Sequence, residues 1–111
     1  VLDLLRSEND ADGSVLAGRV DATRVGAAGH SAGGAAVLTL LRSPMVDAIV
    51  GIAAVGFVSN PRPLPTLFLV ADGDIVVTPE FTRGIYNQLA SPKRFAVIGQ
   101  SGHNSFTDSC D

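Results

Sequence analysis

The feature that most constrains the fold is an alternation of short apolar segments with helical or turn-forming segments. The apolar segments lie at residues 24–28, 48–55, 66–71 and 94–98. Each is apolar along most of its length rather than at every second residue, which is typical of strands buried on both faces. Because helices or crossovers separate them, the strands should run parallel. We therefore predict an α/β fold with about four parallel strands, flanking helices and a sheet that is covered on both faces.

The segments around these strands have sequence patterns that predict helices. A helical stub at 1–5 is followed by a polar, turn-rich loop at 7–14. A helix over 32–41 should stop just before Pro44, because proline disfavours helical geometry in the residue that precedes it. Another helix should begin at Pro79, where the missing N–H is harmless, and end before the next proline. The apolar stripe expected on this last helix consists of Phe81, Ile85 and Leu89.

Composition narrows the class of protein. With 111 residues, 46% hydrophobic and 17% charged, the chain is one folded domain or part of one. Its net charge of -3 is scattered, so no basic stripe is available for nucleic acid. No run approaches the roughly 18 apolar residues of a membrane span. Seven arginines against one lysine fit a GC-rich bacterial genome, and we expect a bacterial protein, secreted or cytoplasmic.

Features at both ends suggest that the chain is part of a longer protein. Val1 is not an initiator methionine, and the first residues read as the middle of a helix. Cys110 has no second cysteine in the chain. It is either a passive thiol or half of a disulfide to a segment outside these residues. We expect residues 1–111 to be a fragment.

A serine lies between two glycines directly after the first apolar segment. Gly29-His30-Ser31-Ala32-Gly33 matches the pattern G-x-S-x-G, with a strand expected before it and a helix after it. A nucleophile on such a sharp turn adopts strained backbone angles, so only very small residues should fit two positions before and after it. The alternative is a tight glycine turn with an inert serine. The His30 ring would shape the local surface rather than act as a base.

A candidate acid and a candidate base follow two later strands. Asp72 and Asp74 occupy a glycine-containing turn after residue 71, and His103 lies in a loop after residue 98. Asp74 is preferred as the acid, with Asp72 as the alternative, because Asp72 is so close to its strand that it could serve only to shape the turn. The chain order Ser31, Asp74, His103 is the order of the serine triad in α/β-hydrolases.

On these motifs the chain resembles the C-terminal half of an α/β-hydrolase. The stretch "LAGRVDATRVGAAGHSAGG" is similar to the elbow region of bacterial dienelactone-hydrolase-like and platelet-activating-factor-acetylhydrolase-like proteins. "PTLFLVADGDIVVTP" resembles their acid turn and "GHNSF" their histidine loop, so the similarity spans residues 16 to 106. One departure is Ala71, where many relatives have glycine. Within the single α/β-hydrolase domain that the resemblance implies, residues 1–111 would be the C-terminal portion.

The resemblance implies a serine esterase with Ser31 as nucleophile, His103 as base and Asp74 as acid. The backbone N–H of Ala32 would be one oxyanion donor, and the first strands and the loop with the second donor would precede Val1. Losing one such donor costs about 2.7–4 kcal/mol, so this fragment alone should be weakly active or inactive.

We expect no metal and no organic cofactor, and a small-molecule or lipid ester with a short or exposed acyl group as substrate. Alternatives are acyl transfer, cleavage of lactone or carbon–carbon bonds with the same residues, or a non-catalytic binding module of the same fold.

Overall fold

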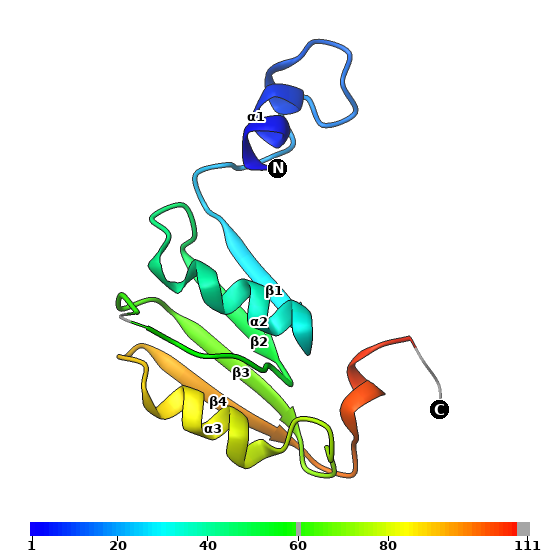
Figure 1. Ribbon diagram of the computed structural model, residues 1–111. Helices are drawn as coiled ribbons and strands as arrows, with labels where there is room; N and C mark the ends of the chain where they lie inside the picture. Colours follow the sequence, from blue (N-terminus) through cyan, green and yellow to red (C-terminus); the bar gives the residue numbers. More distant parts are fainter. Residues whose placement is uncertain (60, 109–111) are drawn as a thin grey trace.

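The computed structural model describes residues 1–59 and 61–108, so Cys110 lies outside the described residues. Within this part of the chain four strands form one sheet in the order β1-β2-β3-β4, and all neighbouring strands are parallel (Figure 1). The predicted α/β fold with about four parallel strands is thereby confirmed. The strands are β1 (Gly26–His30), β2 (Ala48–Ile52), β3 (Thr66–Ala71) and β4 (Lys93–Ile98).

Strand β3 has the predicted bounds and β4 begins one residue earlier, whereas β1 and β2 differ more from the prediction. Strand β1 begins two residues later than expected and runs up to His30, because it pairs in register with the whole of β2. Strand β2 ends at Ile52 rather than at residue 55, because Ala53 adopts a φ of +42°, which leaves the extended region. The first strand therefore ends immediately before Ser31.

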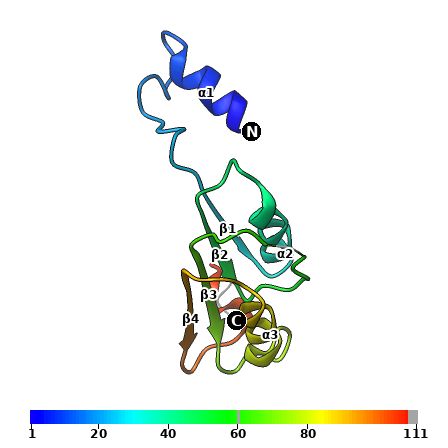
Figure 2. The ribbon, with the colours of Figure 1, turned by 90° about the vertical axis from the view of Figure 1, so that its left-hand side faces the viewer.

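Helices cover one face of the sheet only, so the prediction that both faces are covered was wrong for the described part of the chain. Figure 2 shows α2 (Ala32–Leu38) and α3 (Pro79–Asn87) on the same side of the strands. Ile49, Phe68 and the partly buried Phe95 point into the core between this face and the helices. On the other face Val50, Ile52, Leu67 and Leu69 are only partly buried. Continuous apolar strands indicate two faces that avoid water, but not what covers each.

The helix between β1 and β2 follows the predicted span with a change of type. The α-helix α2 gives way to the 3-10 helix η1 (Thr39–Arg42), and the chain becomes extended at Ser43, before Pro44. Val37, Leu38 and Leu41 are buried against the sheet. The apolar face of this segment thus anchors the turn that precedes it.

Helix α3 begins as predicted and ends earlier. The side chain of Thr78 caps it by accepting the N–H of Phe81, and Pro79 fills the first position. The predicted stripe is only partly correct, because Ile85 and Leu89 are buried but Phe81 is 47% exposed. Thr82 is buried instead and donates its hydroxyl to the carbonyl of Ala54.

The N-terminal segment lies apart from the sheet, as Figure 1 shows. Helix α1 (Leu2–Asp10) is longer than the predicted stub and includes residues expected in a loop. Hydrogen bonds from the following turn stabilise its end: Ser14 donates to Glu8, and the N–H of Gly18 donates to the carbonyl of Asn9. None of its residues is buried.

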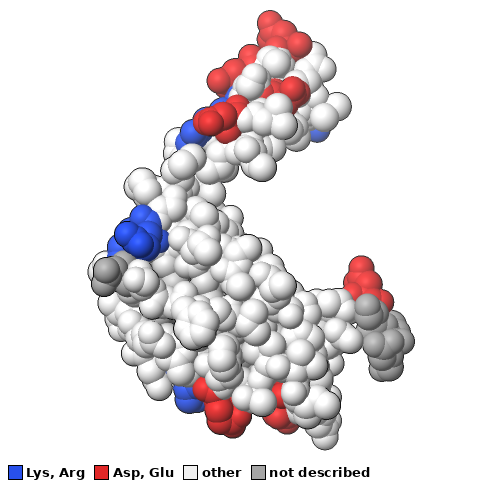
Figure 3. Space-filling model, in the orientation of Figure 1, with Lys and Arg blue, Asp and Glu red and all other residues white. Residues whose placement is uncertain are grey.

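Charged side chains are unevenly placed on the face shown in Figure 3. Acidic residues gather around the N-terminal segment at the top, whereas the surface over α2 is largely uncharged. No helix in the described residues is long and apolar enough to cross a membrane.

Candidate active site

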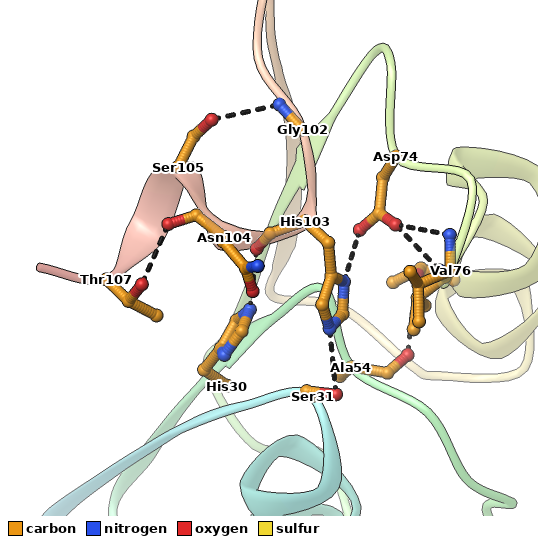
Figure 4. A network of polar contacts seen from close by, with 12 residues as sticks. His30, Ser31, Ala54, Asp74, Val76, Gly102, His103, Asn104, Ser105 and Thr107 are labelled. Atoms are coloured by element: carbon orange, nitrogen blue, oxygen red, sulfur yellow. Dashed lines mark hydrogen bonds and ion pairs between the residues drawn. The ribbon is translucent and has the colours of Figure 1, made fainter. Parts of the chain in front are cut away.

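Ser31, Asp74 and His103 meet at the carboxyl edge of the sheet, although they follow three different strands. Ser31 follows β1, Asp74 lies in the turn after β3, and His103 begins the short 3-10 helix η2 (His103–Phe106) after β4. Parallel strands end at the same edge, so the loops that follow them converge there. Figure 4 shows the three side chains pointing toward one another from these segments.

Ser31 occupies a strained turn between β1 and α2. Its φ of 53° and ψ of -116° lie outside the regions that most residues with a side chain adopt. The turn is held on both sides, because the N–H of Ser31 donates to Ile52 and its carbonyl accepts the N–H of Ala35. The strain predicted from the sequence at this serine is therefore present, and it turns the hydroxyl out of the sheet toward His103.

The glycines around Ser31 differ in their need to lack a side chain. A Cβ at Gly29 would lie 2.1 Å from the carbonyl oxygen of Gly33, so no larger residue fits there without movement of the backbone. A Cβ at Gly33 would meet nothing within 4 Å, and the expectation that only a very small residue fits this position was wrong. The second tight position is Gly34, where a Cβ would lie 2.7 Å from the Cα of Ala54. The sequence pattern located the turn but not this close contact with the β2–β3 connection.

His103 bridges the other two side chains. Its Nδ1 lies 2.7 Å from Oδ2 of Asp74 and its Nε2 lies 3.0 Å from Oγ of Ser31. An ionised carboxylate only accepts, so Nδ1 carries the proton and donates to Asp74, and Nε2 is left to accept the Ser31 hydroxyl. The His103 side chain keeps 14% of its surface exposed. This arrangement is able to withdraw a proton from the Ser31 hydroxyl.

The Asp74 carboxylate is buried and fully engaged. Its Oδ1 accepts the N–H groups of Val76 and Val77 at 2.9 and 2.7 Å, while Oδ2 faces His103. Burial by itself would raise the pKa of this carboxyl, but the hydrogen bonds from Val77, His103 and Val76 outweigh it and lower the pKa below the ordinary 3.8. Asp74 is thus a fixed negative charge beside the imidazole.

Asp72, the alternative acid, has a different task. Its two carboxylate oxygens accept the N–H groups of Gln100 and Ser101 at 3.0 and 3.2 Å, and these hydrogen bonds lower the pKa of the Asp72 carboxyl. The adjacent Gly73 also donates its N–H to the carbonyl of Ser101. Asp72 therefore ties the loop before His103 to the turn that holds Asp74, and the structure brings Asp74 rather than Asp72 to the imidazole.

The His30 ring contacts the backbone of His103. The Nε2 of His30 lies 2.9 Å from the carbonyl oxygen of His103, and the two imidazole rings are tilted by 43° with centroids 4.7 Å apart. The centroid of the Phe106 ring, at the end of η2, lies 6.2 Å from that of the His30 ring. The sequence placed His30 at the local surface without this contact, because the partner is far along the chain.

Ala32 is the first residue of α2. The first N–H groups of a helix have no acceptor within the helix, so α2 itself does not use the N–H of Ala32.

Ser31 and His103 are partly buried, and Asp74 is buried. Two surface hollows of about 470 Å³ lie elsewhere, one over the amino half of the uncovered sheet face and one between α1 and β1. Among residues 1–59 and 61–108 no group of three or more His, Cys, Asp or Glu side chains is placed to hold a metal ion.

Comparison with solved structures supports the fold. The chain is similar to the esterase domain of a Rhodothermus marinus protein, with a TM-score of 0.58 and 21% identity over 68% of this chain. It spans 51% of that domain, which is about half its length. A search of curated proteins finds no match.

One family model matches the entire sequence. The model of PET hydrolase-like proteins, named PETase, matches residues 1–111. This confirms the superfamily indicated by the sequence motifs. The narrower resemblance to dienelactone-hydrolase-like and platelet-activating-factor-acetylhydrolase-like proteins stays a prediction. The chain belongs to the PET hydrolase-like family of the α/β-hydrolase superfamily.

Proposed function

We propose that this chain carries the catalytic residues of a serine ester hydrolase that works through an acyl-enzyme. The observation that carries the proposal is the bridge formed by His103, 3.0 Å from the Ser31 hydroxyl on one side and 2.7 Å from the Asp74 carboxylate on the other. These distances lie within hydrogen-bond reach, which a nucleophile, base and orienting acid require. The family and the esterase domain of similar fold support the same class of reaction.

In the proposed mechanism Ser31 Oγ attacks the ester carbonyl as His103 Nε2 takes the hydroxyl proton. Asp74 keeps the imidazole in the required tautomer and stabilises its positive charge. The negative charge that develops on the carbonyl oxygen is stabilised by the N–H of Ala32 at the start of α2. His103 then returns the proton to the leaving alcohol, and a water molecule, activated by the same imidazole, hydrolyses the acyl-enzyme.

We also propose that residues 1–111 form the C-terminal portion of one α/β-hydrolase domain. The support is that the chain spans about half of the similar esterase domain, and that the helices of residues 1–59 and 61–108 cover only one face of the sheet. In this proposal a segment of the preceding portion supplies the second oxyanion donor. The fragment alone would then be weakly active or inactive.

The substrate proposed is an ester with a short or exposed acyl group. The three side chains lie at the carboxyl edge of the sheet, and the two residues after Asp74, Ile75 and Val76, are 91% and 68% exposed. They offer an exposed apolar surface on the turn that holds Asp74. The name of the family makes small terephthalate esters a suitable class of test substrate in addition to acetate and longer acyl esters.

The test is hydrolysis of p-nitrophenyl acetate by the full-length protein beside its Ser31→Ala variant. Loss of a triad nucleophile should lower kcat by at least about a thousandfold. The thermal unfolding midpoint should hardly change, because the serine side chain is not part of the core. Equal rates in the two proteins would overturn the proposal and favour a non-catalytic binding module.

Product analysis addresses the chemistry in the same preparation. Release of free acid and alcohol from simple esters supports hydrolysis. Transfer of the acyl group to an added alcohol in preference to water, or turnover of lactones or carbon–carbon bonds without esters, would replace ester hydrolysis by another reaction of the same three residues.

A further inference from the structure

His30 lies next to the nucleophile in the sequence and contacts the backbone of His103. It is the last residue of β1 and directly precedes Ser31, so its ring and the Ser31 hydroxyl leave the same short stretch of backbone. The ring is half-buried, and its Nε2 lies 2.9 Å from the carbonyl oxygen of His103. Since a carbonyl oxygen only accepts hydrogen bonds, His30 Nε2 must carry the proton and donate it.

The segment that carries His103 has little apolar packing to fix it. It forms one short 3-10 helix in which no residue is buried, and Asn104 and Ser105 are exposed. Hydrogen bonds from neighbouring segments therefore determine its place. Asp72 holds the loop before it, at Gln100 and Ser101. The bond from His30 acts at His103 itself.

Both hydrogen bonds of the His103 imidazole depend on that backbone position. The ring must stay 3.0 Å from Ser31 and 2.7 Å from Asp74 at the same time. Asp74 is fixed by two backbone N–H groups, and Ser31 by the β1–α2 turn. A small displacement of the His103 backbone would lengthen one bond or both, and a misplacement of about 1 Å is able to cost a hundredfold in rate.

We propose that His30 is a positioning residue for the reaction: its Nε2–H holds the main chain of the base, His103, against the strand that carries the nucleophile. The inference rests on the proposed function, since it assigns His30 a part in the same chemistry. His30 acts through His103 and does not exchange a proton with the substrate. Among the residues that the structure describes, no hydrogen bond joins the His30 ring to Ser31 or Asp74.

Two variants separate the hydrogen bond from the ring. His30→Phe keeps an aromatic ring against His103 and Phe106 but removes the donor. His30→Gln removes the ring but places an amide N–H at about the reach of the imidazole Nε2. The phenylalanine variant should lower kcat by about ten- to a hundredfold with KM nearly unchanged, and the glutamine variant should recover most of the loss.

The measurement is kcat and KM for p-nitrophenyl acetate in the full-length protein, beside the rate of covalent labelling by a fluorophosphonate. Thermal unfolding of each variant checks that it is folded. Should His30→Phe fail to fold, His30→Asn replaces it, because its shorter amide cannot reach the carbonyl. Gln88→Leu is the matched control: it removes a side-chain donor to the carbonyl of Gly84 on α3, away from the site, and should leave kcat unchanged.

The outcomes are distinct. A loss of kcat and of labelling rate in the variant without a donor, with recovery in His30→Gln, supports the positioning role. Unchanged kcat in His30→Phe, equal losses in both variants, or a rise in KM alone would overturn it, the last indicating a contact with the substrate. Failure of the proposed function is recognised separately, by activity that survives in Ser31→Ala.

Discussion

The carboxyl edge of the sheet and its helix-covered face are built on the same four strands but are stabilised in different ways. At the edge, Asp72 and Asp74 join the turn after β3 to the loop after β4 through hydrogen bonds to backbone N–H groups and to His103. On the covered face, Phe68 and Ile49 are almost completely buried among apolar side chains of α2 and α3. The edge contains little apolar packing, and the core beneath the helices contains few polar groups.

Under the proposed function, the reaction therefore takes place at the edge, while most of the stability comes from the core. Hydrogen bonds fix direction as well as distance, which suits groups that must transfer a proton. Apolar burial is not directional and supplies most of the free energy of folding. Substitutions at the edge should therefore change activity more than stability, and substitutions in the core should do the reverse.

The largest effect is expected from Asp74→Asn. The asparagine oxygen is still able to accept the N–H groups of Val76 and Val77. Its NH₂ group cannot accept the Nδ1–H of His103, so the imidazole is no longer held in the required tautomer and has no negative charge beside it. We predict a loss of kcat of about ten-thousandfold, as for this replacement in other serine triads. Initial rates of ester hydrolysis measure it.

Asp72→Asn provides the comparison within the same turn. It weakens an anchor of the histidine loop without touching the imidazole, so its loss of kcat should be much smaller. If the two variants lost activity equally, Asp72 would have to be counted with the catalytic groups, contrary to the geometry.

In the core the largest effect is expected from Phe68→Ala. The Phe68 side chain is fully buried between the sheet and the helices, and such truncations cost about 3–5 kcal/mol in the free energy of unfolding. Urea unfolding followed by circular dichroism measures the loss. The fraction that remains folded should keep its kcat.

Ile75→Ala is the control at the edge. Ile75 is 91% exposed, so its truncation should leave the free energy of unfolding nearly unchanged. A loss comparable to that of Phe68→Ala would show that the edge takes part in the apolar core.

A smaller effect distinguishes two glycines of the serine turn. Gly29→Ala forces a Cβ against the carbonyl of Gly33 and should destabilise the protein by about 1–3 kcal/mol, with a parallel loss of activity. Gly33→Ala adds a methyl group in open space within α2, where alanine is up to about 1 kcal/mol better than glycine. Thermal unfolding of both variants checks the order, and similar losses would contradict the geometry of the turn.

The smallest expected effect is a loss of stability at acidic pH. Hydrogen bonds lower the pKa values of Asp72 and Asp74 below their ordinary 3.8, so each carboxylate contributes stability above that pH and loses it as pH falls through the lowered pKa. The free energy of unfolding, measured between neutral pH and about pH 3, should fall toward acid. In the Asp72→Asn variant the free energy of unfolding should fall less steeply with decreasing pH. Identical slopes in the variant and the unchanged protein would rule out a contribution from Asp72.

The sequence predicted much of the edge because its signals are local. Continuous apolar runs mark the strands, and the turn chemistry after residues 71 and 98 places Asp74 and His103 at strand ends. The order of these residues then suggested their meeting with Ser31. The structure brings all three within hydrogen-bond distance, while their catalytic roles remain predictions for the experiments above.

What the sequence missed depends on contacts between distant segments. The bond from His30 reaches a residue 73 positions away, and the tight contact of Gly34 is with Ala54 on another connection. Similarly, an apolar strand does not reveal that helices cover one of its faces only. Such contacts follow from packing, which local propensity does not specify.

The most direct test of the central claim is to map covalent labelling. The full-length protein is treated with a fluorophosphonate, digested, and its peptides are analysed by mass spectrometry. We predict one adduct per chain, on Ser31, formed much more slowly in Asp74→Asn. An active esterase that is labelled at another serine, such as Ser101 or Ser105, or not labelled at all, would contradict the assignment of Ser31 as the nucleophile.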